Sequence, residues 1–83
     1  MEVMTMKTPG GLLALWRASQ EPVVTQVELA KRLDIDGSML SLMERDHKVP
    51  GIDLAERIET VTSNGIGPRV RASSWRARKG RAA

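Results

Sequence analysis

The feature that most constrains this chain is the stretch 25–44, whose pattern predicts two short helices joined by a tight turn. Thr25 is a good N-cap residue, and Glu28 follows it at the three-residue spacing of a capping box. Leu29 and Leu33 then fall on one face of a helix because they are four residues apart. The first helix of the pair is therefore expected to begin at Thr25 and to end near Leu33.

The second helix of the pair is expected over residues 37–44. Asp36 is a candidate N-cap for it, and Leu40 and Met43 supply its apolar positions. Ala30, in the preceding helix, is small enough to let the two helices cross closely, as a turn of three or four residues requires. This pattern is typical of a helix-turn-helix and favours a DNA-binding protein.

Two further helices are predicted around this pair. One begins at Pro9, a residue suited to a first helical turn, and runs to about Ala18, before the break at Pro22. The other runs from about Ile52 to Thr62 and is followed by a glycine stop.

Composition favours a single small domain built from helices. At 83 residues, the chain buries only about 60–65% of its unfolded surface, so its stability margin is thin. Aromatic residues make up 2% of the chain, which disfavours an all-β fold because strands favour aromatic side chains. We therefore expect an all-α fold, a compact bundle of four to five helices.

The chain has no Cys and a single His, His47, which excludes disulfides, thiolate metal sites and a zinc site built from this residue alone. We expect no metal and no cofactor. No apolar run approaches the length of a membrane span, and the N-terminus lacks the apolar core of a signal peptide. The simplest expected compartment is the cytoplasm, without membrane contact.

Charge is distributed unevenly along the chain. The net charge is +3, but residues 1–68 hold seven basic and ten acidic residues, whereas residues 69–83 hold six basic residues and no acidic one. We expect an N-terminal arm over 1–8, the helical domain over 9–68 and a basic tail over 69–83. Such a tail is an electrostatic handle for polyanions; the alternative is a tail that only improves solubility. Trp75 is expected to fold back onto the domain or a partner, with loose residues after it.

A combined set of positions points to one family. The set is Gln26, Leu29, Ala30, Leu33, Ile35, Leu40, Ser41, Glu44 and Pro50. With these residues the stretch 12–62 resembles the Xre/Cro family of phage and bacterial repressors. The resemblance implies a lambda-repressor-like bundle and an operator-binding repressor that acts as a homodimer on an inverted repeat in the bacterial or phage-infected cell, at the nucleoid. Asp34 stands where the family usually has Gly, and Asp tolerates a left-handed backbone better than most residues.

The resemblance also implies a DNA-binding surface on and around the second helix of the pair. Gln26 is expected to bind a phosphate and brace the reading helix, and the basic residues after that helix are expected to meet flanking phosphates. The expected DNA-binding residues are Gln26, Asp36, Gly37, Ser38, Met39, Ser41, Leu42, Arg45, His47, Lys48, Arg69 and Arg71. The alternatives left open are that Met39 belongs to the core, that Leu42 packs against a protein partner, and that the charged residues are simply solvated.

In related repressors an Arg of the first helix pairs with the Glu that ends the reading helix. The resemblance therefore implies an ion pair between Arg17 and Glu44 with a structural rather than a catalytic role.

Three function classes are weighed. The leading one is a sequence-specific transcriptional regulator, a homodimer on double-stranded DNA. The alternative is an antitoxin-like or phage accessory module that binds another protein through the apolar face at Met39 and Leu42. An enzyme is not expected, because the carboxylates are spread along helices, and Asp34 and Asp36 are better explained by the turn and the cap.

Overall fold

The computed structural model describes residues 8–75, and they form helices with no strand among them. The helices are α2 (Pro9–Ser19), α3 (Gln26–Leu33), α4 (Gly37–Glu44) and α5 (Ile52–Thr62), and residues 72–75 are helical as well. The expected all-α class is confirmed, and each helix begins and ends within one residue of its predicted bounds. Residues 1–7 of the expected arm (1–8) and the residues after Trp75, which were expected to be loose, lie outside the described residues.

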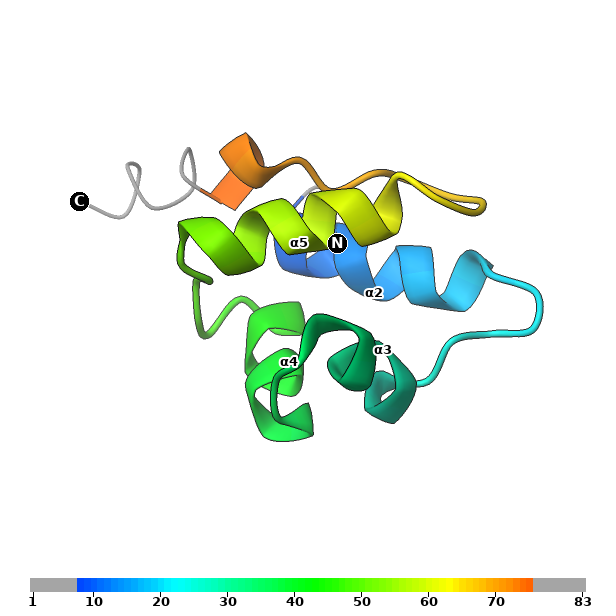
Figure 1. Cartoon of the computed structure of the whole chain (residues 1–83), viewed down its shortest axis with the longest axis horizontal. Helices are drawn as coiled ribbons and strands as arrows, with labels where there is room; N and C mark the ends of the chain where they lie inside the picture. Colours follow the sequence, from blue (N-terminus) through cyan, green and yellow to red (C-terminus); the bar gives the residue numbers. More distant parts are fainter. Residues whose placement is uncertain (1–7, 76–83) are drawn as a thin grey trace.

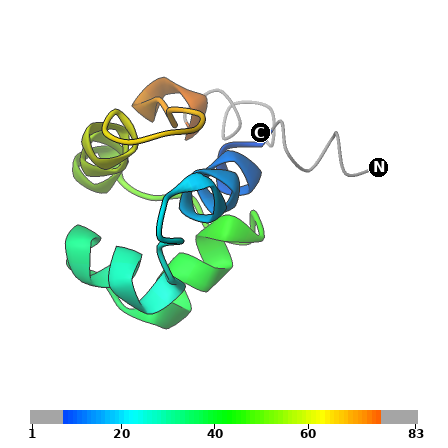
Figure 2. The ribbon, with the colours of Figure 1, turned by 90° about the vertical axis from the view of Figure 1, so that its right-hand side faces the viewer.

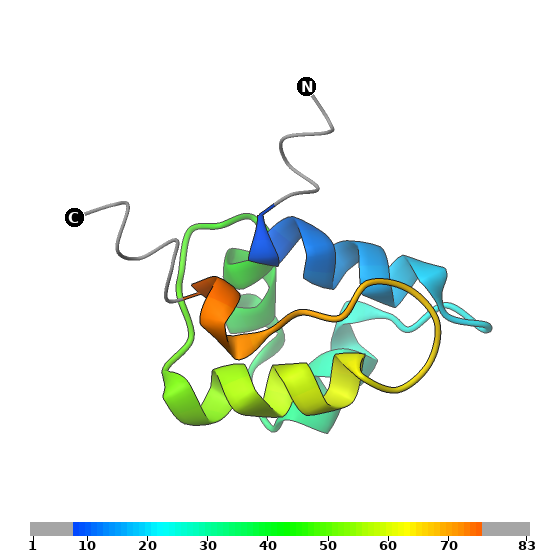
Figure 3. The same ribbon diagram turned by 90° about the horizontal axis from the view of Figure 1, so that it is seen from above.

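Helix α4 contacts both α2 and α3, and α3 also contacts α5. Helices α3 and α4 lie below α2 in Figure 1, while α5 and the residues that follow lie above, and the view in Figure 2 agrees. Seen from above, the closing segment (residues 63–75) runs back along the seam between α2 and α5 (Figure 3). The chain thus ends its described course on the side opposite to α4.

The helix starts follow their sequence signals only in part. Thr8 Oγ1 accepts a hydrogen bond from the Gly11 N–H at 3.0 Å, and Thr25 Oγ1 accepts one from the Glu28 N–H at 3.1 Å. The Glu28 carboxylate lies 3.5 Å from Arg32, one turn further along the same helix. Asp36 has the extended backbone of an N-cap, but its exposed side chain makes no capping hydrogen bond. Asp36 is therefore the N-cap residue of α4, as predicted, and it begins the helix through its backbone, since the Leu40 N–H donates to Asp36 O at 3.1 Å.

The turn between α3 and α4 is formed by a left-handed residue, as expected. Asp34 has φ 60° and ψ 47°, and its N–H donates to Lys31 O at 3.1 Å. The Ile35 N–H reaches back to Ala30 O at 3.0 Å, which is the bond pattern of a Schellman motif. Ile35 is half-buried against the core, so the turn is closed by an apolar contact as well.

The core draws on every helix and on the closing segment. Its buried apolar residues are Leu13, Trp16, Val24, Leu29, Ala30, Leu33, Leu40, Met43, Ala55, Ile58, Val70 and Trp75. Val70 is fully buried and Trp75 is 2% exposed, so the prediction that Trp75 folds back onto the domain is confirmed. The boundary at residue 68 therefore separates regions of different charge that share one core.

A glycine allows α2 to approach α4 closely. A Cβ at Gly10 would clash with Met43 O and would lie 2.6 Å from Asp46 Oδ1. Any larger residue would push the start of α2 away from the end of α4. No described helix has the length and apolar character that a membrane span requires.

Candidate functional site

One buried carboxylate joins three helices. Arg17 Nε and Nη2, from α2, donate to the two oxygens of Glu44 at 2.7 and 2.9 Å. Gln26 Nε2, at the start of α3, donates to Glu44 Oε1 at 2.9 Å. Glu44 ends α4 and is only 8% exposed. The ion pair implied by the resemblance is thus present, and it is bidentate, the arrangement that fixes orientation best.

The ion pair keeps Arg17 charged. The hydrogen bonds to Glu44 raise the pKa of Arg17 above its ordinary value; partial burial opposes this, and the charge of Glu44 adds to it. Arg17 Nη1 also donates to Val24 O at 3.2 Å, in the loop that leads into α3. The guanidinium therefore holds both α4 and the entry to α3.

The outer face of α4 is exposed and carries no long polar side chain. Gly37 and Ser38 are exposed, and Leu42, one turn after Ser38, is 36% exposed. Ser41 and Met39 are half-buried, and Met39 packs against the core. Leu40, Met43 and Glu44 take the inward positions of α4, so its outer face consists of Gly37, Ser38, Ser41 and Leu42.

Basic side chains follow directly after α4. Arg45, His47 and Lys48 are all exposed. The His47 N–H donates to Leu42 O at 2.8 Å, so the chain wraps tightly around the helix end. Arg45 Nε lies 3.4 Å from Ser41 O, a weak contact that leaves most of the guanidinium available. Three of the predicted phosphate-binding residues thus gather at one end of α4.

The other two predicted basic contacts lie elsewhere. Arg69 and Arg71 are exposed, but they belong to the closing segment, which runs on the far side of α2 from α4 (Figures 1 and 2). The structure therefore does not bring them together with the outer face of α4.

Two exposed apolar residues at the entry to α3 were not among the predicted site residues. Val23 and Val27 are 55% and 65% exposed. Val27 could have been identified from spacing, because it falls outside the stripe formed by Leu29 and Leu33. Gln26 beside it is half-buried. One N–H of its side-chain amide donates to Glu44, and the second N–H can donate to another acceptor.

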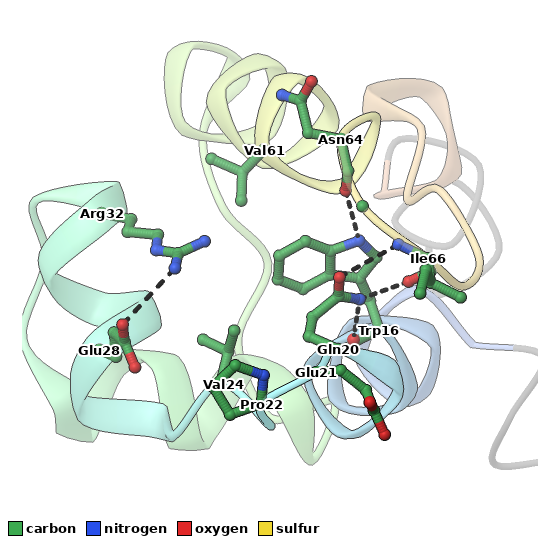
Figure 4. A pocket seen from close by; sticks show the side chains of 11 residues that line it. Trp16, Gln20, Glu21, Pro22, Val24, Glu28, Arg32, Val61, Asn64 and Ile66 are labelled. Atoms are coloured by element: carbon green, nitrogen blue, oxygen red, sulfur yellow. Dashed lines mark hydrogen bonds and ion pairs between the residues drawn. The ribbon is translucent and has the colours of Figure 1, made fainter.

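A hollow lies between the end of α2, helix α3 and the closing segment. It has a volume of about 520 Å³, and Figure 4 shows Arg32 of α3 across its opening from Trp16 of α2. Its polar groups are used in holding the fold: Trp16 Nε1 donates to Asn64 O at 3.1 Å, and Gln20 Oε1 accepts from the Ile66 N–H at 3.1 Å. The charged residues in its lining are Glu21, Glu28 and Arg32, of which Glu28 and Arg32 contact each other at 3.5 Å.

Metal ligands are not clustered in the part of the chain that the structure describes. No three His, Cys, Asp or Glu residues of 8–75 lie close enough together to hold a metal ion. Comparison with known proteins finds no match to a protein-family model, a curated protein or a solved structure.

Proposed function

We propose that this protein is a sequence-specific DNA-binding regulator that inserts α4 into the major groove as a helix-turn-helix. The observation that supports this is the Glu44 carboxylate, which fixes α4 against α2 and α3 while leaving the outer face of α4 exposed. A helix that must read DNA needs this combination of rigid support and open surface. At about 1.5 Å per residue, α4 is about 12 Å long, comparable to the width of the groove.

The charges at the end of α4 supply the phosphate contacts in this proposal. Arg45, His47 and Lys48 are positioned to meet the backbone beside the groove, and the free N–H of Gln26 offers a further donor. Residues 8–75 carry eight basic and nine acidic residues, so attraction to DNA must come from this local cluster and from the basic residues after Trp75.

The protein acts in this proposal as a repressor, a homodimer on an inverted repeat in the cytoplasm of a bacterial or phage-infected cell. Occupying a promoter requires no chemistry, and two copies would place two α4 helices in successive major grooves, about 34 Å apart. The exposure of Leu42 favours a second candidate, an antitoxin-like or accessory module that binds another protein through this face.

Selection from a pool of random DNA duplexes tests the proposal. The expected result is a palindromic consensus with half-sites about 10 base pairs apart, centre to centre. An absence of any consensus, together with a stable complex with another protein, would contradict it and support the second candidate.

A matched pair of charge variants tests the face that is used. Lys48→Gln should weaken binding to all sequences and reduce the slope of log affinity against log salt by about 0.9. Arg71→Gln removes the same charge on the far side of α2 and should leave both quantities unchanged. Equal losses in the two variants would show that α4 is not the DNA-binding side.

A further inference from the structure

The outer face of α4 lacks the side chains that usually discriminate base pairs. Arg, Lys, Asn and Gln make paired hydrogen bonds to base edges, and none of them occurs within α4. Ser38 offers only a hydroxyl, which donates or accepts and so discriminates weakly. Gly37 offers no side chain. Specific reading by hydrogen bonds alone is therefore poorly supported on this surface.

Leu42 is the one large side chain at the centre of this face. It lies one helical turn after Ser38 and is 36% exposed, whereas Leu40 and Met43 beside it are fully buried. The backbone at Leu42 is also well fixed, because Leu42 O accepts the His47 N–H at 2.8 Å and Arg17 holds Glu44, two residues further on. An apolar side chain on a well-fixed stretch of backbone thus lies at the centre of the face that the proposed function places in the groove.

Only one standard base offers an apolar partner in the major groove. Thymine carries a C5 methyl group there, while the other bases present hydrogen-bond donors and acceptors. Placing Leu42 against a donor or acceptor would remove that group from water without replacing its hydrogen bond. Thymine is therefore the base that Leu42 tolerates best, and the contact removes apolar surface of both partners from water.

We infer that Leu42 reads a thymine methyl group, so that each half-site of the recognised DNA carries a thymine opposite it. This inference rests on the proposed DNA-binding function. It assigns selectivity to an apolar contact and assigns to Arg45, His47 and Lys48 the positioning of the helix.

Replacing thymine by uracil tests the inference, because uracil lacks only the methyl group and keeps the same base pairing. The probe is a duplex of the selected consensus, with each thymine replaced in turn. One position in each half-site should lose about fourfold in affinity, the value of burying one methyl group. The remaining thymines should tolerate replacement.

The variant Leu42→Ala completes the test. It should bind the thymine and uracil duplexes equally, and its melting temperature should stay close to that of the parent because Leu42 lies outside the core. Ile52→Ala, which shortens an exposed apolar residue at the start of α5, is the matched control and should keep the uracil effect.

Three results would overturn the inference. If the consensus is bound but uracil is tolerated everywhere, Leu42 does not read a methyl group, while the proposed function stands. If Leu42→Ala keeps the uracil effect, another residue reads the thymine. If no consensus is selected, the proposed function and this inference fall together.

Discussion

Helix α2 is held on its two sides by contacts of different chemistry. Toward α3 and α4, its polar link is the charged pair of Arg17 and Glu44. Toward the closing segment, Trp16 and Gln20 make neutral hydrogen bonds to the backbone of Asn64 and Ile66. The charged side fixes the direction of one helix, whereas the neutral side closes the core.

The closing segment is also tied to α5 along its length. Thr62 Oγ1 accepts the Val70 N–H at 2.9 Å, and Glu59 Oε1 accepts the Ala72 N–H at 3.1 Å. These bonds bring Val70 and Trp75 into the core. Stability should therefore depend most on the side of α2 that faces the closing segment. Under the proposed function, DNA affinity should depend most on the side that faces α3 and α4, and variants can test this difference.

The largest loss of stability is expected from Trp75→Ala. Removing a buried indole should cost about 3–5 kcal/mol, through lost apolar burial and a cavity. Trp75→Phe should cost less, because it keeps a ring and removes an indole N–H that is buried without a partner among the described residues. Urea unfolding of both variants measures the difference, and equal losses would contradict this account.

The burial of Val70 and Trp75 also affects any test of the basic tail. A chain ending at Pro68 would lose Val70 and Trp75 from the core, so its salt dependence would report unfolding. Changing the basic residues after Trp75 to Gln keeps Val70 and Trp75 in the chain and isolates the contribution of those charges to the salt slope.

Arg17→Ala should cost about 3 kcal/mol, because it leaves Glu44 buried without its cation. DNA affinity should fall as well, since α4 loses its support. Changing Arg17 and Glu44 together to Met should restore much of the stability but not the DNA affinity. Full recovery of both would show that the pair does not orient α4.

The pH dependence of this pair has a definite sign. Because the pKa of Arg17 is raised in the folded protein, its contribution to stability is complete below the ordinary Arg value and is lost only as pH rises through the raised one. Urea unfolding at neutral and mildly alkaline pH should therefore show no loss of stability that depends on Arg17. A loss that is absent from the Arg17→Ala variant would contradict this.

A smaller loss is expected from Gly65→Ala. Gly65 has φ 88°, and an added Cβ would clash with Gln20 Oε1, so the free energy of unfolding should fall by about 1–2 kcal/mol. Gly37→Ala is the matched control: nothing lies within 4 Å of its Cβ position, and it should stabilise by about 0.4–1 kcal/mol. Thermal unfolding of both variants provides the measurement, and losses of equal size would contradict this.

The smallest effect is expected from Arg32→Gln. Arg32 and Glu28 form an exposed pair within one helix, with side chains 47% and 55% exposed, and should contribute at most about 0.5 kcal/mol. The contrast with Arg17→Ala separates a pair on the surface from one in the interior. A loss above 1 kcal/mol would give Arg32 a role that its single weak contact does not explain.

Local chemistry accounts for what sequence could predict. The cap at Thr25 and the left-handed turn at Asp34 each depend on neighbours a few residues away, so the pattern located both. The pattern also located Asp36 as the N-cap of α4, where the backbone alone begins the helix through the bond from the Leu40 N–H to Asp36 O.

The features that the sequence could not predict depend on long-range contacts. Gln20 meets Ile66 across 46 residues, and no local pattern encodes this. The same limit applies to the site. The ion pair of Arg17 and Glu44 was expected only because the chain resembles a known family. The sequence pattern did not predict that the segment with Arg69 and Arg71 would lie on the far side of α2 from α4.

The two tryptophans make this asymmetry visible to spectroscopy. Trp16 and Trp75 are both buried on the side of the closing segment, and the chain has no Tyr. Intrinsic fluorescence therefore reports solvent entry at that side and carries no chromophore on α3 or α4. Unfolding should shift the emission to longer wavelength, whereas an event confined to the outer face of α4 should leave it unchanged and needs a label placed there.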